Sequence, residues 1–557
     1  GQEAVVAGLA HDGQLTLNPP IELSEGATLE LSTGEEAPVL AARLLTQTPL
    51  NQPFPALKMR LGTTRGTNAL LERRGGRVAL LVTKGFRDLL KIGTQQRPHL
   101  FQLAIPPADV LYEDVFEVEE RVSADGQVIH ALRPDSLQKL IQALQTGQYD
   151  AIAVSLLNAY CNPIHEKILK QTLEASGISP VTLSTDVSTS PGYLARTQTA
   201  VVDAYLMPVL KTYLDNIRTQ LSGGGANRQT VRVMTSAGGL VRSELFRPKD
   251  SLLSGPAGGV IGAGHTGGGG RLLTLDMGGT STDVARLENG RPDYRFTTRI
   301  GPFELQLPSL AIETVAAGGG SVCWFDAAFG QLRVGPQSAG ASPGPACYGA
   351  TGPDQPLLMT ITDVNLLLHK LHPSQFSIPI FYEKAQQALE ALLHTIEEHT
   401  GKKPDETAIL RGLERIADEA MAGAIRKISV QRGFDPAHYP LLVFGGAGGL
   451  HACQVARLLG IDTVILPYDG GLLSAYGIGQ ARIERGASLS ILQTLDLVEP
   501  GLSARFDDLV RQAGDALRQD VGPDTPLETL SERIFLRLKG QEATLDVVYR
   551  EKNYLDE

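Results

Sequence analysis

Short apolar runs alternate with amphipathic stretches in the first third of the chain. Val78–Thr83 and Ala151–Leu157 are continuous apolar runs, which is typical of strands buried on both faces. Pro134–Thr146 and Pro163–Ser176 have the spacing of amphipathic helices, with proline at the first position. This alternation predicts a largely parallel sheet flanked by helices.

The remaining pattern predicts further α/β structure. Arg196–Gln220 reads as a long helix that ends at a serine and glycine run, residues 222–225, which we take as a domain boundary. Later come a helix that ends near Ile428, the strand Leu441–Phe444 and the helix Leu450–Leu459. We therefore expect three segments: an N-terminal domain (1–222), a second domain (223–490) and the start of a C-terminal β-rich segment (491–557).

Composition narrows the classes of partner. The chain has 557 residues and a net charge of −11 without a Lys/Arg block, so nucleic acid and acidic membranes are not expected partners. No apolar run reaches the roughly 18 residues that a membrane span needs. The four cysteines form no CxxC pair, which argues against a zinc ribbon and favours reduced cysteines in a cytoplasmic protein.

The sharpest motif is the segment Leu275–Val284, in which a buried strand meets two glycines and then a second strand. Backbone N–H groups at Gly278 and Gly279, with the Thr280 hydroxyl, would form a concave site for phosphate. Asp276 would then hold Mg²⁺ through water, and Asp283 would orient a water molecule or the metal. The alternative is an ordinary hairpin whose turn happens to contain two glycines.

A second glycine-rich motif joins the strand Leu441–Phe444 to the following helix. Its glycines suit a phosphate or a ribose because a helix N-terminus offers free N–H groups; they are Gly445, Gly446, Gly448 and Gly449. The spacing does not fit GxGxxG, since His451 stands at the third glycine position, and no P-loop pattern is present. Close packing of strand and helix is the alternative explanation.

Together the two motifs resemble the phosphate and adenosine motifs of the actin, Hsp70 and sugar-kinase superfamily. In that superfamily two ribonuclease H-like domains close over ATP, and one hairpin from each domain grips the phosphates. The resemblance therefore implies an α/β fold with a nucleotide cleft, in which residues 276–282 and 445–449 converge on one triphosphate.

Longer motifs narrow the resemblance to the hydantoinase/oxoprolinase family, over residues 59–490. They are GTTRGTNALLER (Gly62–Arg73), TKGFRD (Thr83–Asp88), IGTQQRP (Ile92–Pro98), LSGPAGGV (Leu253–Val260), TVAAGGGS (Thr314–Ser321), VGPQSAG (Val334–Gly340) and PGPACY (Pro343–Tyr348). Family members usually begin with a D-x-G-G-T-F-T-D hairpin. This chain has none before Gly62, so we expect the first phosphate hairpin to be missing.

The resemblance implies ATP-dependent hydrolysis of a cyclic amide, namely 5-oxo-L-proline to L-glutamate with release of ADP and phosphate. ATP would phosphorylate the lactam carbonyl, Mg²⁺ would accompany ATP, and a hydantoinase B-like subunit or domain would be the partner within a homo-oligomer. Alternatives are a hydantoin hydrolase (hydantoinase A), an acetone- or acetophenone-type carboxylase subunit, and a nucleotide-gated actin-like scaffold without turnover.

Candidate substrate residues lie in the first motifs of the family. We expect Thr63, Thr64, Asn68 and Arg97 to contact the ring substrate, with the Arg97 guanidinium suited to a carboxylate. The two threonines and Asn68 could instead cap a helix, and Arg97 could form a surface ion pair. Two further alternatives remain open: residues 318–320 form an anion nest or a turn, and His451 contacts ribose or caps its helix.

Overall fold

The computed structural model describes residues 33–96, 103, 108–222, 230–349, 357–376, 378–541 and 544–549, and the backbone of strands β1 (Val5–Leu9) and β2 (Leu15–Asn18). The chain divides into two compact units. The first contains Gly1–Ala56 and Asp215–Arg228, and the second contains Leu57–Leu214 and Gln229–Glu557. Helix α7 (Tyr193–Ser222) contributes residues to both units.

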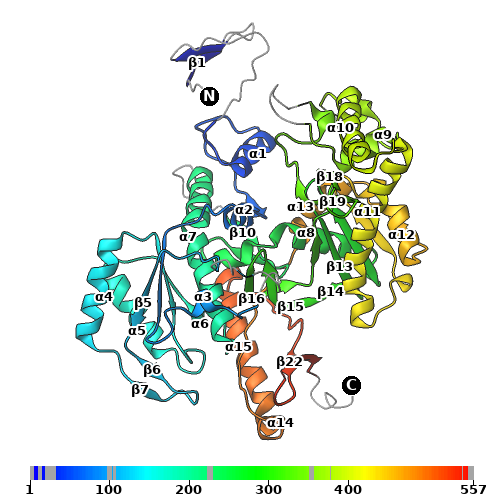
Figure 1. Cartoon of the computed structure of the whole chain (residues 1–557). Coiled ribbons are helices and arrows are strands. Elements are labelled where there is room, and N and C mark those ends of the chain that lie inside the picture. Colours follow the sequence, from blue (N-terminus) through cyan, green and yellow to red (C-terminus); the bar gives the residue numbers. More distant parts are fainter. Residues whose placement is uncertain are drawn as a thin grey trace. The chain divides into compact units, whose positions relative to one another are not determined.

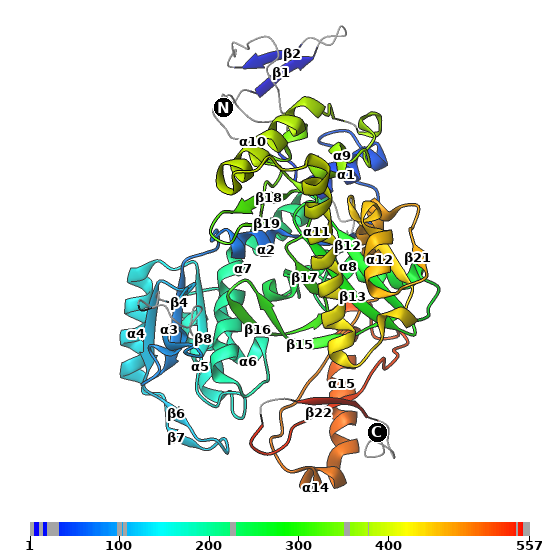
Figure 2. The same cartoon turned by 45° about the vertical axis from the view of Figure 1, so that its right-hand side comes forward.

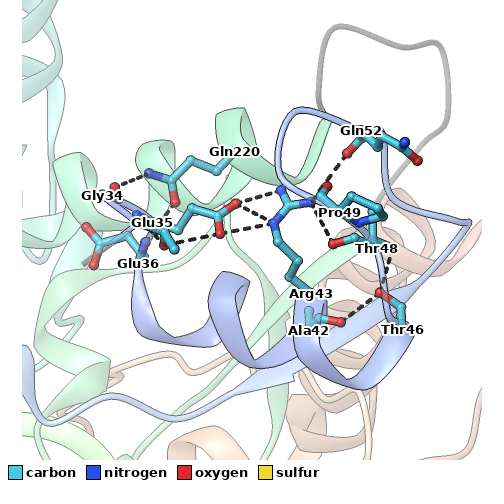
Figure 3. A network of polar contacts seen from close by, with 11 residues as sticks. Gly34, Glu35, Glu36, Ala42, Arg43, Thr46, Thr48, Pro49, Gln52 and Gln220 are labelled. Atoms are coloured by element: carbon cyan, nitrogen blue, oxygen red, sulfur yellow. Dashed lines mark hydrogen bonds and ion pairs between the residues drawn. The ribbon is translucent and has the colours of Figure 1, made fainter. Parts of the chain in front are cut away.

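In the first unit, helix α1 (Ala37–Thr46) is held by a buried arginine (Figure 3). Arg43 forms a two-pronged ion pair with Glu35, at 2.6 Å from Nη2 and 2.9 Å from Nε to Oε1, and donates to the carbonyl of Pro49 at 2.6 Å. The Gln220 amide accepts from the N–H of Glu36 at 2.9 Å. These bonds fix both ends of the helix and the turn that follows it.

A parallel sheet forms the N-terminal part of the second unit. Its strands, in spatial order, are β5 (Asp114–Val118), β4 (Val78–Thr83), β8 (Ala151–Ser155) and β9 (Val181–Leu183). Alternate residues face opposite cores, so Leu80 packs with side chains of α7 whereas Leu81 packs with α4 (Pro134–Gly147) and α5 (Ile164–Ala175). The predicted parallel sheet with helices on both faces is confirmed.

A mixed sheet of six strands follows later in the chain. In spatial order it contains β14 (Arg291–Pro292), β13 (Thr282–Glu288), β12 (Leu272–Met277), β20 (Leu441–Phe444) and β21 (Val464–Ile465), and β17 (Glu313–Val315) also pairs with β13. β12 and β13 form the predicted antiparallel hairpin, in which Met277 lies opposite Thr282. β20 runs parallel to both β12 and β21.

Helices cover both faces of this mixed sheet (Figure 2). Leu275 and Val443 face the core built with α11 (Glu406–Ile428) and α12 (Ala452–Leu459). Leu442 and Phe444 face the core built with α8 (Ser254–Thr266) and α13 (Leu473–Gln480). The fold is therefore α/β, as expected, and strands with apolar residues on both faces are buried from both sides.

Figure 1 labels many of the remaining elements. A three-stranded sheet contains β11 (Leu240–Arg242), β10 (Thr230–Met234) and β3 (Lys58–Leu61). Two-stranded hairpins are β6–β7 (Arg121–Val122, Val128–His130), β15–β16 (Tyr294–Ile300, Phe303–Leu310), β18–β19 (Ser321–Asp326, Gln331–Ser338) and β22–β23 (Arg533–Leu536, Leu545–Val548). The other helices are α2 (Arg65–Leu71), α3 (Leu89–Ile92), α6 (Ser184–Val187), α9 (Ile361–Leu367), α10 (Tyr382–Thr400), α14 (Leu495–Val498) and α15 (Leu502–Val521). None of the helices in the described ranges is long and apolar enough to cross a bilayer.

Candidate functional site

The two glycine-rich motifs lie side by side at one edge of the mixed sheet. β12 and β20 are adjacent parallel strands, with Asp276 opposite Phe444, so the turns that follow them leave from the same edge. The N–H of Ala447 donates to the carbonyl of Met277 at 3.1 Å and joins the two turns directly. Residues 276–282 and 445–449 therefore lie side by side in a single sheet and not across a cleft, as the resemblance had implied, and their convergence on one triphosphate stays a prediction.

Packing explains some of the glycines at this edge. Gly445 has a φ of +80°, and a Cβ there would lie 2.5 Å from the Asp276 Oδ1 atom. A Cβ on Gly448 would lie 2.8 Å from the Val443 side chain. Both positions therefore require glycine for reasons internal to the chain.

The other glycines at the edge have no such reason. Gly279, Gly446 and Gly449 are exposed, have no positive φ, and a Cβ at each would meet no heavy atom within 4 Å. Within the described ranges, no hydrogen bond uses the N–H groups of these three residues or of Thr280. Open glycines with available donors are what a site needs where a ligand approaches the backbone closely.

A third glycine segment supports the tip of the β12–β13 hairpin. Gly319 N–H donates to the Gly278 carbonyl at 3.0 Å, and Gly320 N–H donates to the Gly279 carbonyl at 2.6 Å. Gly318 N–H donates to the Ser321 hydroxyl at 2.8 Å. Because these donors are used inside the chain, the structure favours the turn over the anion nest, and the segment fixes the peptide planes of the tip.

Two carboxyl groups face each other beside the turns. Asp276 and Asp283 are directly opposite in the antiparallel register, so their side chains lie on the same face of the hairpin. Burial, and to a lesser extent the charge of Asp283, raise the pKa of Asp276 to about 7. Burial also raises the pKa of Asp283, although its Oδ1 atom accepts from the Thr314 hydroxyl at 2.5 Å.

In the described part of the chain, this acidic pair has no positive partner. Among the described side chains, no ion pair joins either aspartate to a lysine, arginine or histidine. The described residues also contain no group of three or more His, Cys, Asp and Glu side chains able to enclose a metal. Two carboxylates beside an open backbone fit Mg²⁺, which keeps several waters and also binds substrate phosphates.

His451 and Cys347 are both structural groups. His451 is fully buried; its Nδ1 atom is 2.6 Å from the Asp418 Oδ1 atom, and its Nε2 atom is 3.1 Å from the Asn365 Nδ2 atom. Both ring nitrogens are thus engaged, which leaves none for a ribose. Burial, together with the nearby Asp363 carboxylate, raises the pKa of the buried Cys347 thiol, which disfavours a thiolate nucleophile.

The predicted substrate residues lie at the end of β3 and the start of α2. Thr63 is buried, and its Oγ1 atom accepts from the N–H of Arg65 at 3.2 Å, so it stabilises the helix start. Thr64 and Asn68 have exposed side chains. Arg97 lies outside the described residues. No hydrogen bond within the described ranges connects these positions to the glycine turns, and their role in binding substrate stays a prediction.

The motifs recur in known proteins. Residues 196–486 match the model of the hydantoinase/oxoprolinase family, and residues 22–177 match the model of the hydantoinase/oxoprolinase N-terminal region. The chain belongs to the hydantoinase/oxoprolinase family. Both glycine turns and the Asp276–Asp283 pair fall within the first of these matches.

Relatives in this family are considerably longer. The 5-oxoprolinase of Saccharomyces cerevisiae is 38% identical over 461 residues, which is 75% of this chain and 35% of that protein. The ATP-dependent caprolactamase from Pseudomonas jessenii has a similar structure, with a TM-score of 0.75 and 27% identity over 98% of this chain and 79% of that chain. Nucleotide-free acetone carboxylase shares the fold, with a TM-score of 0.65 and 24% identity over 87% of this chain and 71% of that chain.

The sequence analysis gave no role to three residues that contact the glycine segments or His451. Asn365 and Asp418 bind His451, and Thr362 binds the third glycine segment. A local signal was present near two of them, since Thr360 and Asp363 form a capping box that marks the start of α9. Asp418 lies within a helix, and no sequence signal reveals its partner.

Proposed function

We propose that this chain is the ATP-binding part of an enzyme that hydrolyses a cyclic amide, with 5-oxo-L-proline as substrate. One observation carries the proposal: the open backbone at Gly279, Gly446 and Gly449 meets the Asp276–Asp283 pair at one edge of a sheet. The backbone offers donors for phosphate oxygens, and the carboxyl pair offers a site for the accompanying cation.

The chemistry explains why ATP is required. A lactam resists attack by water because of amide resonance and a poor nitrogen leaving group. Transfer of the γ-phosphoryl group to the carbonyl oxygen gives ADP and an activated imidate-like phosphate. Addition of one water to the activated carbon breaks the C–N bond and opens the ring, with the proton going to the nitrogen and the phosphoryl group kept as an acyl phosphate. A second water hydrolyses this acyl phosphate, so 5-oxoproline, ATP and two waters give glutamate, ADP and phosphate. Positioning and charge neutralisation are the tools that such a transfer needs.

The residues present fit a magnesium ion. Asp276 would hold it through water and Asp283 would hold or orient a second water. Mg²⁺ neutralises charge on the β- and γ-phosphates when it is bound. Gly279 and Thr280 would cradle phosphate with their N–H groups. The expected Gly278 N–H is not available, because it donates to the Ser281 carbonyl at 3.0 Å. The second turn would contact the adenosine side of ATP. Of its glycines, Gly446 and Gly449 have the open backbone, whereas Gly445 and Gly448 are needed for packing.

The order of strands supports a ribonuclease H-like mixed sheet, which is the finer fold that we propose. β3 resembles β20, since each is followed by a turn and a helix and has a parallel neighbour, β10 or β21. β20 also pairs with β12, whereas β3 has no second neighbour in the described residues. We keep residues 1–222, 223–490 and 491–557 as the proposed domains.

Names of relatives support the substrate class and a partner. One curated relative is the caprolactamase subunit alpha of Pseudomonas jessenii, and others are 5-oxoprolinases, so lactams recur. We propose a hydantoinase B-like subunit or domain as the partner for ring opening, within a homo-oligomer. Thr64 and Asn68 stay candidates for substrate contacts, with Thr63 and Arg97.

The test has two stages. Calorimetry on the chain measures binding of ATP with Mg²⁺; absence of binding overturns the nucleotide site. ATP hydrolysis is then measured with the hydantoinase B-like partner, with and without 5-oxo-L-proline, a hydantoin or caprolactam. Stimulation by 5-oxoproline supports the proposal. Binding without stimulation by any lactam supports a scaffold, and stimulation by bicarbonate with a ketone supports the carboxylase alternative.

A further inference from the structure

Helix α9 contacts the support of the first glycine turn. The N–H and the hydroxyl of Thr362 both donate to the Gly319 carbonyl, at 2.7 and 2.8 Å. Gly319 N–H in turn donates to the Gly278 carbonyl at 3.0 Å. Gly319 therefore links Thr362 to the tip of the β12–β13 hairpin through consecutive hydrogen bonds.

The same helix also contacts the second glycine turn. Asn365, one turn after Thr362, donates from its amide to the His451 ring at 3.1 Å. The His451 N–H donates to the Gly448 carbonyl at 3.1 Å, and its ring binds Asp418 on α11. Residues three apart lie on one face of a helix, so Thr362 and Asn365 present one face to both turns.

Gly319 is the point where the three segments meet. A Cβ at Gly319 would lie 2.9 Å from the Thr362 hydroxyl and 3.6 Å from the Ala447 Cβ, with the Gly278 carbonyl oxygen at 4.0 Å. No side chain fits between α9 and the two turns. A displacement of α9 would therefore be transmitted to both turns rather than absorbed by loose packing.

The position of α9 is itself fixed by a buried carboxylate. Asp363 is fully buried and accepts from the N–H groups of Cys347 at 2.8 Å, Ala346 at 3.2 Å and Thr360 at 2.9 Å, and from the Thr360 hydroxyl at 2.7 Å. Hydrogen bonds to an ionised group are stronger than neutral ones. The start of α9 thus cannot shift without leaving a buried carboxylate poorly bonded.

The Asn365 side chain lowers the stability of the fold in this position. The residue is 1% exposed, and its Oδ1 atom has no hydrogen-bond partner in the described part of the chain. A buried polar atom without a partner destabilises the fold, and an apolar side chain of similar shape would avoid that cost. Its retention here indicates a role other than stability.

From these contacts we infer that α9 sets the spacing of the two glycine turns, with Thr362 and Asn365 as positioning residues for the nucleotide. The inference rests on the proposed function for its ligand, ATP with Mg²⁺. The geometry that it describes, two turns held at a fixed separation by one helix, exists in the chain without a ligand.

The first test removes the Thr362 hydroxyl. In Thr362→Val the backbone N–H still binds Gly319, but the hydroxyl donor is lost. We expect about three- to tenfold faster hydrogen exchange in residues 277–281, read at the bonded N–H of Gly278, and a dissociation constant for ATP with Mg²⁺ raised by a similar factor, since one neutral hydrogen bond is lost. Thr362→Ser keeps the hydroxyl and should restore both values.

The matched control is Thr395→Val on α10. The Thr395 hydroxyl donates to the Ala391 carbonyl at 3.0 Å within its own helix, so the same chemical change occurs away from the turns. The control should leave exchange in residues 277–281 and the ATP dissociation constant as in the unmodified chain. If Thr362→Val behaves like this control, the inference is overturned.

The second test asks whether the two contacts act through one helix. Asn365→Leu should speed exchange in residues 446–450 and, because α9 loosens as a whole, also in residues 277–281. The double variant should weaken ATP binding by less than the product of the two single effects, as coupled sites do. Independent effects, each confined to one turn, would contradict the inference. If the unmodified chain binds no ATP, the proposed function fails, whereas the exchange measurements still decide the role of α9.

Discussion

Two sheets in the second unit end their parallel strands in opposite ways. At the carboxyl edge of the β4–β8 sheet, charged groups are buried and fully bonded within the chain. At the carboxyl edge of β12 and β20, backbone donors are open and two carboxyl groups have no positive partner among the residues that the structure describes. Ligands of α/β proteins usually bind beyond the carboxyl ends of parallel strands. Both edges have this position in their sheets. They differ in whether their polar groups have hydrogen-bond or ion-pair partners in the described part of the chain.

The first edge is closed by two buried networks. Glu166 accepts from the Leu156 N–H at 2.9 Å and the Ser184 hydroxyl at 2.6 Å, and Arg196 donates to the same hydroxyl at 3.0 Å and to the Leu156 carbonyl at 2.8 Å. A second network joins His165 to Glu120 at 2.7 Å. These groups are bonded to one another and to the backbone, and so they hold the loops after β8 and β9.

The largest expected effect is a loss of stability when the buried network at the edge of the β4–β8 sheet is broken. Arg196→Met removes a fully buried guanidinium and leaves the Leu156 carbonyl and the Glu166 charge without it, so we expect about 3–5 kcal/mol less stability. Urea unfolding measures the loss. Arg299→Met, at an exposed position, should cost less than about 0.5 kcal/mol. A stable Arg196→Met variant with abolished ATP binding would contradict the comparison.

At the open edge, the charge of Asp276 should matter for ligand and not for fold. In Asp276→Asn we expect ATP with Mg²⁺ to bind about ten- to 100-fold more weakly, as when a group that orients a metal or its waters is lost. The melting temperature should stay constant or rise, because a partly buried carboxyl has been removed. Calorimetry and thermal unfolding check the two values, and a large drop in melting temperature would show a structural role.

The raised pKa of Asp276 gives a pH dependence. Its ordinary value is 3.8 and its folded value is about 7, so the folded state favours the protonated form. The contribution of this group to stability is present below pH 3.8 and is lost as pH rises to about 7. Cation binding needs the ionised form, so affinity for ATP with Mg²⁺ should be roughly tenfold lower at pH 6 than at pH 8. Calorimetric titration with ATP and Mg²⁺ at several pH values checks this for the unmodified chain and for the Asp276→Asn variant. The affinity of the variant should depend much less on pH.

The smallest effects separate the two kinds of glycine in one turn. Gly446→Ala meets no neighbouring atom and should stabilise the chain by about 0.4–1 kcal/mol, while ATP binding weakens. Gly445→Ala places a Cβ against Asp276 at a φ of +80° and should instead destabilise the chain. Urea unfolding and calorimetry of both variants check the opposite signs. Equal stability changes would remove the distinction between packing and open glycines.

Local patterns predicted the elements that carry the site. The apolar run before Asp276 and the glycines after it predict the β12–β13 hairpin, and the apolar strand before Gly445 predicts β20. The hairpins between Tyr294 and Ser338 were not predicted; of their strands, β16 has the alternation of buried and exposed residues that marks a half-buried strand, whereas β15 and β19 alternate less regularly. The predicted substrate residues show a limit of local patterns, since the burial of Thr63 depends on Ser254.

The sequence by itself determined the family, the hairpin and the glycine turns, because each depends on residues that are close along the chain. Only the tertiary structure decided which glycines are open, that the N–H groups of Gly319 and Gly320 bind the hairpin tip, and that His451 is buried against Asp418. The contacts of Gly445 with Asp276, Gly319 with Gly278 and His451 with Asp418 join residues 33 or more positions apart, and no local spacing specifies such pairs. They follow from strand order and helix packing, which place distant backbone groups within hydrogen-bond distance.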